Sequence, residues 1–243
     1  MRGRAVTMQS LFADSINAHA MRFEKPLAPA YGDDAGLRML AAFLVVAIAM
    51  PFALRFALDV TGVRGMPGAS LGFVVAWLAA FILVHWSFVR VPMAAVGLRA
   101  FAEWTRRERL YLVQVVPLAA VAFAVLFRAH LQALIDRHGL AGFLLLSVLG
   151  GFAWGIAQEF IYRGWLQTEL TRRFGAIAGL VAANLVFTFG PLHLDHFGGP
   201  GGARWGGLAA IFGIGLFFGI VYFRSGNVWI PAAMHGLWPL NMN

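Results

Sequence analysis

Cysteine is absent from this 243-residue sequence, which excludes disulfide bonds, thiolate zinc sites and a cysteine nucleophile. Charge is also scarce, because Asp, Glu, Lys and Arg make up 12% of the residues while hydrophobic residues make up 60%. A soluble domain of this length could not keep so much apolar surface from water, so we expect lipid to be its main solvent. The net charge of +8 comes from Arg residues placed between apolar runs rather than on one basic face, which argues against a nucleic-acid partner.

The sequence instead contains a series of apolar runs, most of them long enough to cross a bilayer. They predict an all-α fold, a polytopic transmembrane helical bundle of about seven to eight spans. We expect residues 1–37 to form a cytoplasmic or interfacial N-terminal segment and residues 38–243 to form the transmembrane domain. The seven spans that hydropathy delimits are Met39–Ala57, Ser70–Val89, Leu110–Phe127, Ala141–Leu166, Ala176–Leu192, Trp205–Phe223 and Val228–Leu240.

The basic residues predict the orientation of these spans. Of the 19 Lys and Arg residues, fourteen lie on one side of the bilayer if the N-terminus is cytoplasmic, and the excess marks the inner face. We therefore expect a cytoplasmic N-terminus. The stretch Val96–Arg109 is expected on the same side, as an interfacial connector.

Pairs of glycines four residues apart predict close helix packing. Such pairs occur at Gly151/Gly155, Gly175/Gly179 and Gly215/Gly219, and small residues let helix backbones approach each other in lipid. Asn184 is interpreted as a residue that forms an interhelical hydrogen bond.

Ionisable residues inside apolar spans are few, and each is a functional candidate because its burial in lipid is costly. They are Glu159, Arg163, His193 and His235. Glu159 and Arg163 are one helical turn apart and can form an ion pair, which could also exist only to neutralise itself. His85 lies beside Trp86 near the end of a span and is interpreted as an interfacial residue.

The helical rise predicts that three of these groups share one depth. Counted from the turn near Phe174, Glu159 and His193 are roughly 23 and 27 Å away along their helices, and His235 reaches the same slab from a second turn. A carboxylate and two imidazoles at one level can position and deprotonate a water and can stabilise an oxyanion. Peptide hydrolysis is therefore chemically reasonable. The same three residues could alternatively bind zinc, but a ligand carboxylate should not be engaged by Arg163.

Three segments of the second half resemble the motifs of a known family. Gln158–Leu166 resembles an EExxxR motif, Phe189–His193 is similar to an FxxxH motif, and Gly219–His235 resembles a closing hairpin. These are motifs of the CAAX protease and bacteriocin-processing (CPBP) family, which includes the Ras-converting prenyl endopeptidases. The resemblance covers about Ala141–Asn243, which would be the catalytic-type core, and Gly97–Trp104 also looks familial.

The resemblance implies an intramembrane endopeptidase of the bacterial inner membrane. Its substrates would be membrane-tethered peptides or C-terminal sorting tails of the CAAX type, and it would need no cofactor. Glu159 and His193 would orient the water, and Arg163 would hold Glu159. His235, helped by Gln158 or Asn241, would stabilise the oxyanion.

Two positions depart from the family pattern. Gln158 stands where the family has the glutamate proposed to activate water, and an amide cannot accept a proton at neutral pH. Pro239 stands where the family has an asparagine that donates to the oxyanion. Three explanations stay open: a non-catalytic member that serves as an immunity, chaperone or scaffold protein, an engineered Glu-to-Gln change, or a subgroup in which Glu159 takes over the role of the base.

Overall fold

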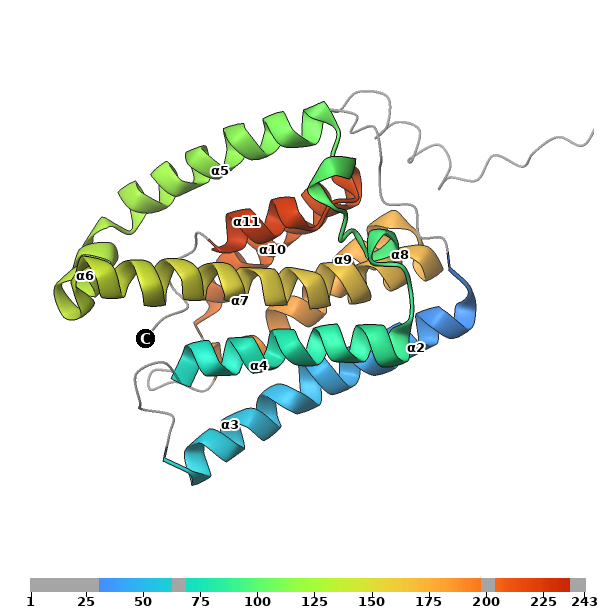
Figure 1. The fold of residues 1–243 in the computed structure, drawn as a ribbon, viewed down its shortest axis with the longest axis horizontal. Coiled ribbons are helices and arrows are strands. Elements are labelled where there is room, and N and C mark those ends of the chain that lie inside the picture. The colour runs from blue at the N-terminus through green and yellow to red at the C-terminus, as the bar shows by residue number, and fades with distance from the viewer. Residues whose placement is uncertain (1–30, 63–68, 198–203, 237–243) are drawn as a thin grey trace, which may run out of the picture.

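The computed structural model describes residues 31–62, 69–197 and 204–236. Across these ranges the chain is helical and contains no β-strand, which confirms the predicted all-α class. The helices lie side by side as a bundle (Figure 1). Their bounds are α2 Asp33–Phe43, α3 Met50–Val60, α4 Ala69–Val84, α5 Arg106–Leu126, α6 Arg128–Gly142, α7 Gly150–Glu159, α8 Thr168–Phe174, α9 Ala176–Phe189, α10 Trp205–Ser225 and α11 Trp229–Gly236.

Wider, π-type turns join several of these helices. Leu44–Ala49 joins α2 to α3, Phe143–Leu149 joins α6 to α7, and Phe160–Gln167 joins α7 to α8. Turns of this kind are uncommon and are found frequently at functional sites. The stretch Phe160–Gln167 begins directly after Glu159, so the end of α7 is a candidate position for such a site.

Four continuous helical segments of the described chain are long and apolar enough to cross a membrane. A fifth is possible if the bent pair Arg128–Leu145 and Gly150–Phe174 counts as one span. The predicted count of seven to eight is not confirmed: α9 has 14 residues, and the last predicted span, Val228–Leu240, extends beyond the described residues, which end at 236. The four segments are Asp33–Val60, Leu71–Val89, Arg106–Leu126 and Trp205–Ser225.

Two glycines and a proline interrupt the helices of the second half of the chain. Gly139 has φ 68° and ψ 168° inside α6, a conformation open essentially to glycine alone, and the long helix toward α7 starts after it. Gly175, with φ 83°, separates α8 from α9. The predicted span Ala176–Leu192 stops at Phe189, because Pro191 follows and the residue before a proline disfavours the helical conformation.

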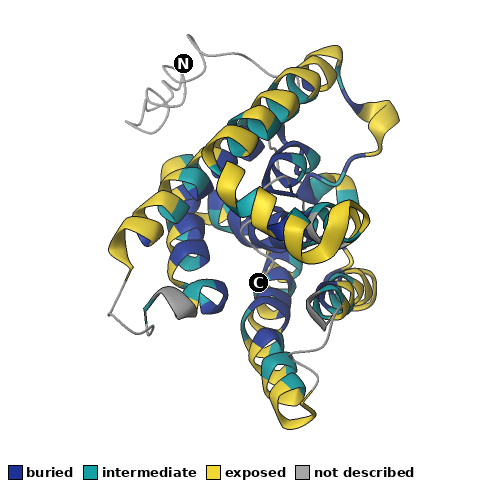
Figure 2. Ribbon diagram, turned by 90° about the vertical axis from the view of Figure 1, so that its left-hand side faces the viewer, coloured by how far each residue is buried: buried dark blue, intermediate teal, exposed yellow. Residues whose placement is uncertain are grey.

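Buried residues gather in the interior of the bundle and exposed ones cover its outer faces (Figure 2). The main core packs side chains of α2, α4, α7 and α9 around the fully buried Trp77 and Trp165. By contrast, apolar side chains such as Phe56 and Leu126 are at least 70% exposed. An exposed apolar surface of this kind is what lipid requires, so the burial pattern agrees with the composition.

One end of the bundle collects several helix termini. Arg172 of α8 pairs with Asp33 at the start of α2 at 2.7 Å, and Nε of Arg38 donates to the carbonyl of Val89. In Figure 1 the starts of α2 and α5 lie with α8 at the right-hand end, whereas α6 and the end of α3 lie at the left. The start of α2 and the start of α5 therefore lie at one end of the bundle.

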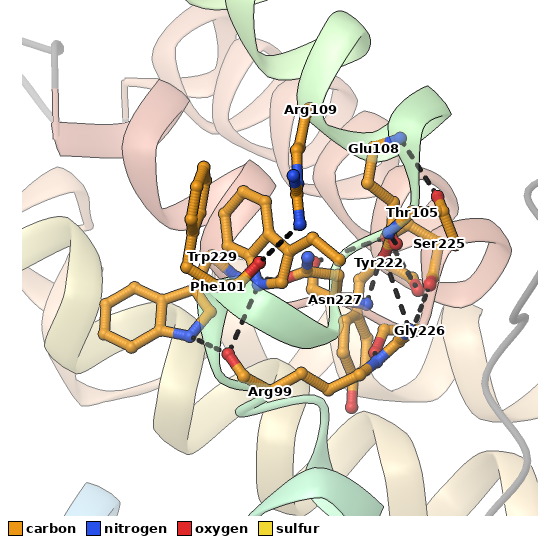
Figure 3. A network of polar contacts seen from close by, with 11 residues as sticks. Arg99, Phe101, Thr105, Glu108, Arg109, Tyr222, Ser225, Gly226, Asn227 and Trp229 are labelled. Atoms are coloured by element: carbon orange, nitrogen blue, oxygen red, sulfur yellow. Dashed lines mark hydrogen bonds and ion pairs between the residues drawn. The ribbon is translucent and has the colours of Figure 1, made fainter.

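The connector between α4 and α5 packs into the bundle through a buried network (Figure 3). The guanidinium of Arg99 donates to the carbonyls of Ser225 and Gly226 and pairs with Glu108 at 3.4 Å. Glu108 also accepts from the backbone N–H of Thr105, whose hydroxyl caps the start of α5 in return. Arg99 and Glu108 are both buried, so this part of the connector lies within the protein rather than at an interface.

Candidate functional site

Glu159, the last residue of α7, is fully buried and holds two partners. Its Oε2 accepts from Nε of Arg163 at 3.2 Å, which is the pair that the spacing predicted. Its Oε1 lies 2.9 Å from Nδ1 of His235 on α11. The carboxylate thus joins residues that are 76 positions apart in the sequence.

Two glycines let α11 come close enough for this contact. A Cβ on Gly155 of α7 would lie 2.5 Å from the backbone nitrogen of Gly236, and a Cβ on Gly236 would lie 2.7 Å from the Cα of Phe152. The backbones therefore touch where the helices cross. His235 is next to this crossing, and Glu159 is one helical turn beyond it. The close glycine packing therefore brings the imidazole of His235 within hydrogen-bond distance of the Glu159 carboxylate.

The start of α11 is held by the connector (Figure 3). The N–H of Val228 donates to the carbonyl of Gly97 at 3.0 Å, and the indole N–H of Trp229 donates to the carbonyl of Arg99 at 3.1 Å. The side chain of Asn227 accepts from the N–H of Trp229 at 3.1 Å. Residues far upstream of the site therefore fix the helix that carries His235.

Arg163 is anchored on its far side by α10. Its Nη2 donates to the carbonyl of Gly215 at 2.9 Å, and one turn later Nε2 of Gln167 donates to the carbonyl of Gly219 at 2.8 Å. A Cβ on Gly215 would collide with the side chain of Asn184 on α9, and a Cβ on Gly219 would lie 3.0 Å from Oε1 of Gln167, so both positions need a small residue. Glycine packing is thus confirmed at Gly155, Gly215 and Gly219, and Asn184 makes the predicted interhelical bond, to the carbonyl of Phe212.

His193 reaches the same region through Phe187 of α9. The carbonyl of Phe187 lies 2.8 Å from Nδ1 of His193. The Phe187 ring lies 5.0 Å from the His193 ring, 6.1 Å from the His235 ring and 4.9 Å from the Arg163 guanidinium carbon. The structure therefore brings Arg163, His193 and His235 together around one phenyl ring.

Sequence reasoning missed Phe187. It selected Phe189 from the motif, but that side chain is 46% exposed while Phe187 is 4% exposed. In the sequence, Phe187 differs from other apolar helix residues only in that it precedes His193 by six positions. That separation alone does not distinguish a site residue from an ordinary core residue.

Gln158 is buried next to Glu159 but points elsewhere around the helix. Within the described part of the chain its Oε1 has no hydrogen-bond partner, and the hydroxyl of Tyr162, one turn on, has none either. Buried polar atoms of this kind are costly and mark places where water or a ligand can bind. Asn241 and Pro239 lie outside the described residues.

The residues do not fit a metal site. Among the residues that the structure describes, no three His, Asp or Glu side chains are arranged to hold a metal ion. Glu159 uses one carboxylate oxygen for His235 and the other for Arg163. The zinc alternative therefore finds no support in the geometry of Glu159, His193 and His235.

His85 corrects an interpretation made from the sequence. It is 1% exposed, accepts from the indole N–H of Trp165 at 3.0 Å, and donates through its other nitrogen to the carbonyl of Val91 at 2.8 Å. A histidine beside a tryptophan near a span end suggests an interface, but here both ring nitrogens are used inside the protein. His85 is a core residue that ties α4 to the stretch after α7.

Comparison with protein-family models gives one match. Residues 139–240 match the family described as type II CAAX prenyl endopeptidase Rce1-like. The matched segment contains Glu159, Arg163, His193 and His235 together with α7, α9, α10 and α11. Comparison with curated proteins and with solved structures gives no match.

Proposed function

Because residues 139–240 match the Rce1-like family of type II CAAX prenyl endopeptidases, we propose that this protein is an intramembrane endopeptidase. Its substrates would be peptides or C-terminal tails tethered to the membrane, since the family acts on such tails and the chain itself carries helices fit for a bilayer. We place it in a bacterial inner membrane with its N-terminus in the cytoplasm.

The observation that carries this proposal is the buried set of Glu159, Arg163 and His235 within the family segment, with His193 on the same Phe187 ring. Ionisable groups in apolar surroundings are costly, and an ion pair alone would need no imidazoles. A carboxylate with two imidazoles can activate water for attack on a peptide carbonyl. Arg163 keeps Glu159 ionised and in place, and the amide of Gln158 can donate to the developing oxyanion.

The test is cleavage of a membrane-tethered reporter peptide by the purified chain in liposomes. We expect cleavage by the parent and a loss of about 10² to 10⁴ in rate for Glu159→Gln, which removes the charge but keeps the shape. Glu103→Gln is the matched control, because Glu103 is an exposed carboxylate of the connector and its loss should leave the rate unchanged.

A non-catalytic role is the second candidate, and two observations favour it. Gln158 and Pro239 replace residues that the family uses, and Glu159 is already engaged on both oxygens. In that case the fold would serve as an immunity, chaperone or scaffold protein that binds a partner helix. Absence of cleavage by a parent chain that inserts and folds normally would favour this role.

A further inference from the structure

We propose that the general base of this protein is His235, oriented by Glu159, rather than a carboxylate. The inference rests on the proposed peptidase function and assigns the group that takes the proton from water. It starts from the contact between Nδ1 of His235 and Oε1 of Glu159 at 2.9 Å.

This contact defines which ring nitrogen carries hydrogen. An ionised carboxylate can only accept hydrogen bonds, so Nδ1 must be the donor. In the neutral imidazole the other nitrogen, Nε2, then has a free lone pair. A carboxylate behind an imidazole both fixes this tautomer and stabilises the imidazolium that forms when Nε2 takes a proton.

Glu159 is placed to orient the histidine rather than to act as the base. Its second oxygen faces Arg163, whose positive charge stabilises the ionised carboxylate and so opposes its protonation. Arg163 is itself fixed by the carbonyl of Gly215. The carboxylate is therefore held through both oxygens and is placed to support the imidazole.

Access to water separates the three residues. The side chains of Glu159 and Arg163 are 0% exposed, whereas the side chain of His235 is 11% exposed. Of these three side chains, only the imidazole can therefore be reached from outside the bundle. Gln158 cannot accept a proton. Nδ1 of His193 lies 2.8 Å from the carbonyl of Phe187, whereas Nδ1 of His235 faces the carboxylate of Glu159.

The proposed step is balanced within the site. Nε2 of His235 takes a proton from water while the water oxygen bonds to the peptide carbonyl carbon, and the carbonyl π electrons move to its oxygen. The imidazolium then gives its proton to the amide nitrogen, the carbon–nitrogen bond breaks and the carbonyl re-forms. The products are a carboxylic acid and an amine, and His235 returns to its starting state.

Two variants of His235 test this role on the full chain in detergent with the tethered reporter peptide. His235→Asn puts an amide N–H near the place of Nδ1, so it keeps a donor for Glu159 and removes the base. We expect its rate to fall by about 10² to 10⁴ while its thermal stability stays close to that of the parent.

His235→Ala leaves space for a small base from solution. We expect imidazole to restore cleavage by His235→Ala by at least about tenfold, and pyrazole, which has the same shape but is a far weaker base, to restore none. Equal rescue by both compounds would show that His235 only fills space. Cleavage by His235→Asn within about threefold of the parent would also overturn the role of base.

The outcomes separate this inference from the proposed function. If the parent cleaves the reporter and His235→Asn does too, the protein is a peptidase with another base. If the parent does not cleave the reporter, both the proposed function and the role of His235 fail.

Discussion

Gln158 and Glu159 are neighbours on α7, but their side chains have different hydrogen-bond partners. Glu159 is held by Arg163 and His235, whereas Gln158 presents an Oε1 without a partner among the described residues. The family pattern predicts a carboxylate at position 158. In this chain the carboxylate that contacts an imidazole lies one residue later, at Glu159.

Gln158→Glu tests this division of roles. With His235 as base, we expect the cleavage rate to stay within about threefold of the parent or to fall, because a second carboxylate beside Glu159 disfavours the ionised form of one of them and competes for Arg163. The measurement is the initial rate on the tethered peptide, with Gln158→Met as the control for loss of the amide. A gain of about 10² or more would mean that the base was missing from the parent.

The ring of Phe187 contacts Arg163, His193 and His235, so a change at this residue should affect both packing and the arrangement of the site. We expect Phe187→Leu to lower the free energy of unfolding by about 1 to 3 kcal/mol and to lower the cleavage rate as well. Phe189→Leu, at an exposed position two residues later, should change neither. Thermal unfolding in detergent and the peptide assay measure both quantities.

At the scale of elements, the crossing of α7 and α11 decides whether Glu159 and His235 meet. Gly155→Ala places a methyl group 2.5 Å from the backbone nitrogen of Gly236, so the two helices must separate. We expect lower thermal stability and a loss of cleavage of at least about tenfold. Gly213→Ala is the control, because Gly213 is also helical but nothing lies within 4 Å of the place that its new methyl group would take; it should be neutral or slightly stabilising.

The pair of Arg99 and Glu108 joins the connector to the start of α5, and its contribution to stability can be measured. Both side chains are buried, and removal of one partner leaves an uncompensated charge. We expect Glu108→Gln alone to destabilise the protein by about 3 to 5 kcal/mol, and Arg99→Met with Glu108→Met to cost less than the sum of the two single changes. A double-mutant cycle from thermal unfolding measures the difference. Strict additivity would contradict the coupling that Figure 3 shows.

Local spacing predicted contacts within an element better than contacts between elements. The Glu159–Arg163 pair followed from a separation of four residues, and Gly155 and Gly215 from the four-residue glycine repeat. The bond between Glu159 and His235 and the buried position of His85 depend on how distant helices cross, which composition does not encode. Hydropathy also placed the end of the span Ala176–Leu192 too late, because it records apolar content and not the break that Pro191 introduces after Phe189.

At the scale of the molecule, the absence of cysteine makes the orientation testable without background. Single cysteines at Asp34 and Phe101 should react with a membrane-impermeant maleimide from the cytoplasmic side, since both positions are exposed and lie at the end where α2 and α5 begin. A cysteine at His138, exposed at the opposite end, should react from the outside. Labelling of Asp34→Cys and Phe101→Cys from opposite sides would contradict the shared end.

The connector network also bears on where this chain can be divided. The family match begins at residue 139, but α11 within it is attached to the carbonyls of Gly97 and Arg99, which lie upstream of the match. A chimeric protein that received only residues 139–240 of this chain would contain His235. It would lack the carbonyls of Gly97 and Arg99, which accept hydrogen bonds from the start of α11. In this molecule the border of sequence similarity and the border of structural dependence differ by more than forty residues. A crossover that keeps the start of α11 attached to its acceptors lies before Gly97.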